Sequence, residues 1–222
     1  NEPRMATYIM PDGTYGKTPA MIENCNLPEG AKLAINPDEF YPNHKATDFY
    51  HHYKEDIAMF AELGFKAFNM TLSWARIFPK GIKAGINPEG VEFYHNVFKE
   101  CLKYGIEPMV TIFHWDLPQA LVDLYGGWES PEIIQDYVTY AKTLFENFGD
   151  KVKYWITLNE QNIFTSLGWL TAQHPPGKFD DQKTFYQVNH YAFMAHARAV
   201  LAYREMGGKG EIGASFAYVP SY

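Results

Sequence analysis

From residue 47 onwards, apolar residues recur at two alternating spacings. Four stretches place them three and four positions apart, which is typical of a helix that buries one face. They predict helices over about 47–63, 87–105, 130–149 and 183–205. The apolar stripes of the first three are Phe49, Tyr53, Ile57 and Phe60; then Val91, Tyr94, Phe98, Cys101 and Leu102; then Ile134, Tyr137, Val138, Ala141, Leu144, Phe145 and Phe148.

Near-continuous apolar runs separate these helices. They predict strands over about 66–74, 108–115, 152–158 and 211–219. Buried strands that alternate with amphipathic helices indicate an α/β fold with a parallel sheet. A doubly wound open sheet and a TIM (β/α)8 barrel both fit this order. The absence of a Gly-rich dinucleotide loop after the first strand favours the barrel.

Four strands make about half of a (β/α)8 barrel, and a closed barrel typically needs about 250 residues. We therefore expect a partial (β/α)8 domain over residues 1–222, with one strand missing at the front and several at the back. Residues 1–46 show little periodicity and many Pro and Gly residues, so we expect a loop-rich region of the same domain. The two open sheet edges predict self-association of the isolated piece.

Composition narrows the class of partner. A net charge of −7 argues against nucleic acid and anionic membranes. The chain contains no apolar run long enough to span a bilayer, which needs about 18 residues or more. Its two cysteines, Cys25 and Cys101, have no metal-binding spacing and suggest free thiols in a reducing compartment. Aromatic residues, at 17%, suit a carbohydrate site, although most of them should belong to the core.

Residues of types that commonly bind sugars lie at the ends of two predicted strands. His114-Trp115-Asp116 ends the second strand, and Asn159-Glu160 ends the third. In a barrel these ends face one pocket. An imidazole and an amide can bind hydroxyl groups, an indole can stack on a sugar ring, and a glutamate can act on a glycosidic oxygen. A structural histidine and a solvated polar pair would be the alternatives for each motif alone.

The segment Phe113-His114-Trp115-Asp116-Leu117-Pro118-Gln119-Ala120-Leu121 resembles the histidine–tryptophan segment of glycoside hydrolase family 1. Thr157-Leu158-Asn159-Glu160 resembles its acid/base motif. Further matching segments run in the same order: Tyr41-Pro42-Asn43-His44, Asp48-Phe49-Tyr50-His51, Tyr53-Lys54-Glu55-Asp56, Ser73-Trp74-Ala75-Arg76-Ile77, Tyr125-Gly126-Gly127-Trp128 and His174-Pro175-Pro176-Gly177. Together they cover most of residues 41–222, as expected of the N-terminal half of a family member.

The resemblance implies a retaining β-glycosidase on a (β/α)8 barrel. Glu160 would be the catalytic general acid/base, and His114, Trp115 and Asn159 would bind the sugar, with Asn159 on the 2-hydroxyl. Such a site needs a second carboxylate about 5 Å away as nucleophile. The acid must stay protonated near neutrality, through burial or a neighbouring carboxylate. Two carboxylates suffice for the chemistry, so no metal and no organic cofactor is implied.

Three features depart from the family pattern. No Glu-Asn-Gly segment, the setting of the family's nucleophile, occurs in the chain, where Glu23-Asn24-Cys25 is a coincidence in the loop-rich region. The family's early glutamine is also absent. Asn69 stands where the family usually has an arginine that pairs with the nucleophile. A neutral amide could not hold that carboxylate ionised in the same way.

The substrate branch is predicted from Gln161 and its neighbours. Gln161 replaces the proline that most β-glucosidases of the family carry after the acid/base. Together with Tyr41-Pro42-Asn43-His44 it looks more like the 6-phospho-β-glucosidase branch, whereas His114-Trp115-Asp116 is closer to ordinary β-glucosidases. We expect a cytoplasmic enzyme of carbohydrate catabolism that acts on a phosphorylated β-linked disaccharide, and a homo-oligomer is compatible with the sequence. A non-phosphorylated β-glucosidase or β-galactosidase, a transglycosylase, and a non-catalytic half-barrel or binding protein remain alternatives.

Overall fold

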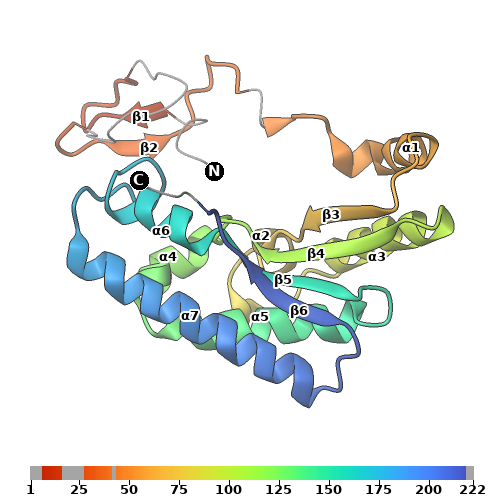
Figure 1. Ribbon diagram of the computed structural model, residues 1–222. Coiled ribbons are helices and arrows are strands. Elements are labelled where there is room, and N and C mark those ends of the chain that lie inside the picture. The colour runs from red at the N-terminus through yellow and green to blue at the C-terminus, as the bar shows by residue number, and fades with distance from the viewer. Residues whose placement is uncertain (1–6, 17–27, 42–43, 219–222) are drawn as a thin grey trace. The chain divides into compact units, whose positions relative to one another are not determined.

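The computed structural model describes residues 7–16, 28–41 and 44–218, and its centre is a four-stranded parallel sheet. The strand order is β3 (Ala67–Thr71), β4 (Glu107–Phe113), β5 (Tyr154–Asn159) and β6 (Glu211–Ser215) (Figure 1). Each strand therefore pairs with its neighbour in sequence. The prediction of an α/β fold with four parallel strands is confirmed.

Residues paired across the sheet alternate between its two faces, and the two faces differ in burial. The row Met70, Val110 and Trp155 is paired in register, and Val110 and Trp155 are fully or almost fully buried. The neighbouring row contains Asn69, which is exposed, and Tyr154, which is 42% exposed. One face of the sheet is thus covered, and the other carries exposed side chains at Asn69 and Tyr154.

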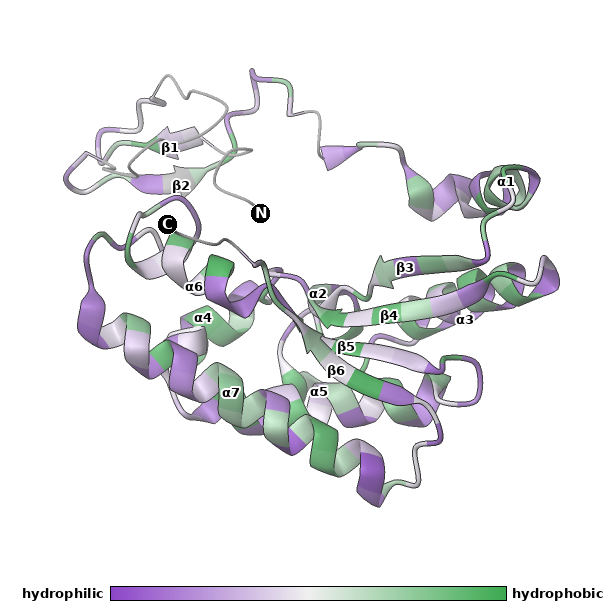
Figure 2. Ribbon diagram, viewed as in Figure 1, coloured by the Kyte–Doolittle hydropathy of each residue, from purple (hydrophilic) through white to green (hydrophobic). Residues whose placement is uncertain are grey.

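Helices cover the buried face. α3 (Pro88–Lys103), α5 (Glu132–Phe148) and α7 (Gln182–Glu205) run along the same side of the sheet (Figure 1). Hydrophobic and hydrophilic residues alternate along α7, as its amphipathic pattern requires (Figure 2). Every predicted member of the α5 stripe is buried, and Phe145 packs edge-on against Trp155 at 5.0 Å.

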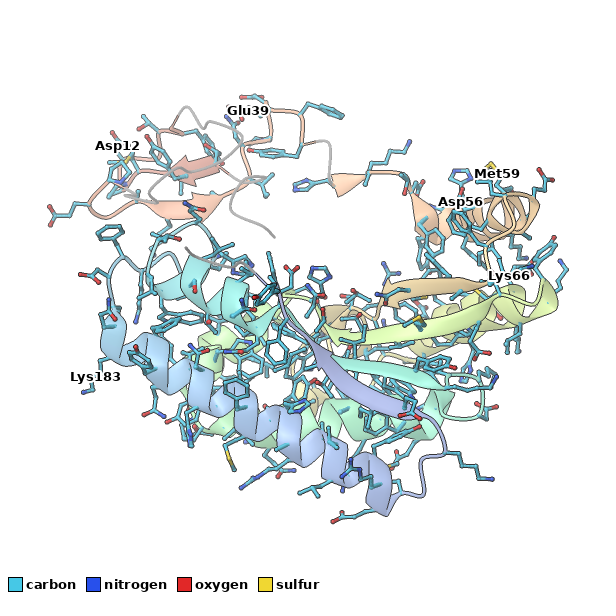
Figure 3. All side chains as sticks on the ribbon, in the orientation of Figure 1. Asp12, Glu39, Asp56, Met59, Lys66 and Lys183 are labelled. Carbon is cyan, nitrogen blue, oxygen red and sulfur yellow. The ribbon has the colours of Figure 1, made fainter. Side chains whose placement is uncertain are left out.

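A second apolar cluster joins α1 (Phe49–Glu62) and α3 to the β3 edge. Ile57, Val97, Cys101 and Ile106 are fully buried there. Burying such an aliphatic side chain stabilises the fold by about 1.5–3 kcal/mol. The predicted α1 stripe, Phe49, Tyr53, Ile57 and Phe60, belongs to this cluster. On the outer side of α1, Met59 points away from the sheet and is 52% exposed (Figure 3).

Several predicted boundaries are wrong. The strand predicted over 66–74 ends at Thr71, because Ser73 caps a short helix, α2 (Trp74–Ile77), with its Oγ accepting from the Arg76 amide at 3.3 Å. The strand predicted over 211–219 ends at Ser215. In the α3 stripe, Leu102 is 43% exposed, since the helix turns this position away from the sheet.

Short elements inside the predicted loops were not expected from the sequence. They are the 3-10 helices η3 (Ile82–Ala84) and η4 (Gly127–Glu129) and the α-helices α4 (Gln119–Tyr125) and α6 (Gln161–Trp169). Residues 1–46 are also more than loop. β1 (Thr7–Ile9) and β2 (Lys32–Ala34) pair antiparallel there.

The chain forms two compact units. One comprises residues 1–48 and 162–186, and the other comprises 49–161 and 187–222. The parallel sheet and the strand-end residues belong to the second unit. That residues 1–222 form one domain stays a prediction.

Candidate active site

The candidate site lies where β4 and β5 end. Phe113 and Leu158 are paired in register, so the residues that follow them emerge side by side at the carboxyl edge of the sheet. His114 and Trp115 follow β4, Asn159 is the last residue of β5, and Glu160 comes next. The structure therefore brings all four predicted site residues to neighbouring strand ends.

His114 and Asn159 are joined directly. Asn159 Nδ2 lies 3.1 Å from His114 Nε2, and Thr71 Oγ1 lies 3.4 Å from His114 Nδ1. Because the amide group can only donate through Nδ2, Nε2 is the acceptor and the ring proton sits on Nδ1. The ring is exposed, so this pair offers polar groups to a ligand while each residue fixes the other.

Trp115 ties the same two strand ends together. Its Nε1 donates to the Asn159 carbonyl oxygen at 2.9 Å. Its backbone φ of 75° lies in the left-handed region that large residues rarely adopt. Such a conformation costs about 1–3 kcal/mol and persists only where surrounding contacts impose it. The indole is thereby held next to the His114 ring, with centroids 5.3 Å apart.

Glu160 is held through its backbone. Its amide donates to the Ser215 carbonyl oxygen of β6 at 2.8 Å, and its φ is 44°. The left-handed turn ends β5 and lets α6 begin at the next residue, Gln161. Gln161 is buried, and its side-chain amide hydrogen-bonds Asn189 Oδ1 of α7. Two of the non-glycine residues with positive φ, Trp115 and Glu160, are thus residues that the sequence places in the site.

Asp116 follows the His114-Trp115 pair and lies in a different environment from Glu160. Its Oδ1 is shielded from solvent. Burial raises the pKa of Asp116 from 3.8 to about 7, although a hydrogen bond from the Ser73 hydroxyl opposes the rise. Nearby, Tyr94 Oη accepts from the Ser73 amide at 2.8 Å, and Tyr140 Oη donates to the Leu72 carbonyl at 2.8 Å. Asp116 thus links the ends of β3 and β4.

Asn69 lies on the open face of β3. Its Oδ1 accepts from Thr111 Oγ1 of β4 at 3.1 Å, and the residue is exposed. The position therefore presents a neutral amide, already engaged with its neighbour, where the sequence resemblance expects an arginine.

Sequence reasoning missed Thr71, which contacts His114 from β3. A threonine inside an apolar strand carries no chemical signal of its own, because β-branched residues are common in strands. Of the predicted motifs, Pro42 and Asn43 lie outside the described residues. In the described ranges, no group of three or more His, Cys, Asp or Glu side chains could hold a metal ion. No helix in those ranges is long and apolar enough to span a membrane.

The sequence matches the profile of glycosyl hydrolase family 1 over residues 33–222. The chain belongs to this family. Curated relatives agree. An aryl-phospho-β-D-glucosidase of Bacillus subtilis, BglC, is 53% identical over 177 residues, which are 80% of this chain and 37% of that protein. The 6-phospho-β-glucosidase AscB of Escherichia coli is 43% identical over 84% of this chain and 40% of its own length.

Solved structures of the family have the same fold. A β-glucosidase from Thermotoga maritima, solved in complex with castanospermine, matches with a TM-score of 0.73 and 44% identity, over 76% of this chain and 38% of that one. A rice β-glucosidase matches with a TM-score of 0.74 and 36% identity, over 78% and 39%. The chain thus spans about two fifths of the length of the relatives it matches, and its sheet corresponds to part of their (β/α)8 barrel.

Proposed function

We propose that the protein is a retaining β-glycosidase and that Glu160 is its general acid/base. The observation that carries the proposal is the position of Glu160. It leaves the carboxyl end of β5 directly after Asn159, whose amide is paired with His114. A carboxyl group beside hydroxyl-reading groups at this edge of a parallel sheet suits chemistry on a sugar.

In the proposed reaction, Glu160 first donates its proton to the glycosidic oxygen as the bond to the anomeric carbon breaks. A second carboxylate attacks that carbon from the other face and forms a glycosyl-enzyme intermediate. Glu160, now ionised, then takes a proton from a water molecule whose oxygen attacks the anomeric carbon. The bond to the second carboxylate breaks, and the sugar is released with its anomeric configuration retained. We propose that the nucleophile is a glutamate of the whole protein that is not among these 222 residues.

Three residues would hold the sugar. The exposed His114 ring and the Asn159 amide can bind hydroxyl groups, and Asn159, next to the acid, would bind the 2-hydroxyl. Hydrogen bonds to that hydroxyl strengthen as the anomeric carbon gains positive charge. The Trp115 indole would contact the ring. Its Nε1 is engaged with the Asn159 carbonyl, so its apolar surface is the part available to the sugar.

For the substrate we propose a 6-phospho-β-glucoside. The identity of 53% to a bacterial aryl-phospho-β-D-glucosidase supports this class, as does Gln161 after the acid. The second candidate is a non-phosphorylated β-glucoside. The 44% identity to the Thermotoga maritima β-glucosidase and the His114-Trp115-Asp116 segment favour it.

The experiment compares nitrophenyl β-glucoside with its 6-phosphate as substrates of the protein expressed from its complete reading frame. We expect a higher kcat/KM for the phosphorylated compound and a product that first appears as the β-anomer by NMR. A higher kcat/KM for the unphosphorylated compound would reject the phosphorylated class. A product that first appears as the α-anomer would reject the retaining mechanism.

A further inference from the structure

The ladder between β5 and β6 is irregular immediately before the proposed acid. Ile156 pairs with Gly213, and the next pair is Asn159 with Ser215. Three steps along β5 thus correspond to two along β6, so β5 carries one extra residue. Bulges of this kind are rare between parallel strands, and they redirect the side chains that follow them.

Thr157 lies inside this bulge, and its side chain forms a hydrogen bond to β6. The residue is fully buried, and its Oγ1 donates to the Gly213 carbonyl at 2.9 Å. A side-chain hydroxyl therefore satisfies a carbonyl of β6 at the irregular step of the ladder. The Thr157 carbonyl in turn accepts from Tyr137 Oη of α5 at 2.5 Å.

His196 of α7 fixes the direction of the Thr157 hydroxyl. His196 Nδ1 lies 2.7 Å from Thr157 Oγ1. Because the hydroxyl proton is given to Gly213, Oγ1 must accept from the histidine, so the ring proton is on Nδ1. Burial lowers the pKa of His196, which favours the neutral ring.

We propose that Thr157, oriented by His196, is a positioning residue that holds the β5 bulge and thereby aims Glu160. The inference rests on the proposed role of Glu160 as the acid. Beyond the bulge, the Glu160 amide is bound to Ser215 and the Asn159 carbonyl to Trp115. Thr157 is thus the last residue before the site whose side chain ties β5 to both β6 and α7.

Loss of the hydroxyl leaves the Gly213 carbonyl and the His196 N–H without their bonds, and β5 shifts to relieve this. A displacement of about 1 Å at a catalytic group can lower the rate by about 100-fold. General acid catalysis itself contributes about 100- to 10,000-fold. A misplaced acid lowers kcat/KM, which reports the steps up to the glycosyl-enzyme, only for those substrates whose leaving group needs a proton.

Leaving-group dependence therefore tests the proposal in the full-length protein. In Thr157→Val, which keeps the shape and loses the hydroxyl, we expect kcat/KM for a methyl or phenyl β-glycoside to fall about 10- to 100-fold. For the dinitrophenyl glycoside, whose leaving group departs without a proton, we expect a change of less than about threefold. Thr157→Ser, which keeps both hydrogen bonds, should restore the poor-leaving-group rate.

Two controls address folding and the role of His196. Thr143→Val removes another buried hydroxyl, which bonds the Thr139 carbonyl within α5, and should leave the leaving-group dependence unchanged. His196→Asn keeps a donor near the position of Nδ1, whereas His196→Gln places it farther out. We expect His196→Asn to stay closer to the wild-type rate on poor leaving groups.

Glu160→Gln, measured in parallel, separates this inference from the proposed function. If Glu160→Gln shows strong leaving-group dependence and Thr157→Val lowers both substrates equally or neither, the positioning role is wrong. If Glu160→Gln itself shows no leaving-group dependence, the proposed acid is wrong.

Discussion

At the scale of single residues, the site contains two carboxyl groups in different settings. The Glu160 backbone amide is bound to the Ser215 carbonyl, whereas the Asp116 side chain is shielded and bound to Ser73. Burial penalises the charged form of a carboxyl group unless enough donors compensate. Burial thus accounts for the pKa of about 7 at Asp116, which follows His114 and Trp115 in the chain.

Asp116 makes the stability of the fold depend on pH. Its pKa is about 7 in the folded chain against an ordinary 3.8, so the folded state binds the proton more tightly. The associated stability is present below about pH 4 and is lost as pH rises to about 7. At about 1.4 kcal/mol per unit of pKa difference, the loss is at most about 4 kcal/mol.

Asp116→Asn mimics the protonated acid and should remove this loss. Between pH 4 and 7 we expect the free energy of unfolding of the variant to fall less than that of the wild type, measured by urea denaturation at each pH. Equal pH dependence of the two proteins would show that Asp116 ionises freely in the folded state. The neighbouring Tyr94 and Tyr140 do not titrate between pH 4 and 7, because burial raises the pKa of both above 10.

At the scale of elements, the β5–β6 pair depends on close packing where β6 begins. Gly210 precedes β6, and a Cβ at this position would lie 2.0 Å from the Lys153 carbonyl oxygen, just before β5. Gly213 lies inside β6, and a Cβ there would meet nothing within 4 Å. The two glycines thus differ in packing although they are three residues apart.

We expect Gly210→Ala to lower the free energy of unfolding by about 2 kcal/mol, because backbone must move to admit the methyl group. The matched variant Gly213→Ala should change it by less than about 0.5 kcal/mol. Thermal or urea denaturation of both variants gives the comparison. Equal effects of the two substitutions would contradict the close approach of Gly210 to Lys153.

An element can be predicted from the sequence when its own residues form a clear apolar pattern. The α5 stripe repeats over 17 residues, and its predicted members are all buried. The strand predicted to reach Trp74 was extended too far because Trp74 is apolar. In the structure the Ser73 hydroxyl caps a helix that begins at Trp74. The β5 bulge cannot be recognised from the periodicity of the sequence, because it depends on pairing with β6, about 55 residues later in the chain.

The same reasoning applies to the site. His114, Trp115, Asn159 and Glu160 could be found from the sequence because polar residues directly follow apolar strands. Thr71 and Thr157 could not, since a threonine in a strand looks like an ordinary β-branched residue. Their roles appear only once β3 lies beside β4 and α7 lies against β5.

At the scale of the whole molecule, the chain corresponds to one part of the longer proteins that it matches. It belongs to glycosyl hydrolase family 1 and spans about two fifths of the length of its relatives. Its sheet has one covered face and one face with exposed Asn69 and Tyr154. The proposed acid, at the carboxyl edge of this sheet, needs a nucleophile about 5 Å away.

The leaving-group dependence of Glu160→Gln in the full-length protein tests the central claim most directly. The account predicts that kcat/KM falls at least about 100-fold for a methyl or phenyl β-glycoside, because the leaving oxygen loses its proton donor. For the dinitrophenyl glycoside, kcat/KM should stay within about threefold of the wild type, since bond cleavage there needs no proton. Equal losses for both substrates, or no loss for either, would contradict the assignment of Glu160 as the acid.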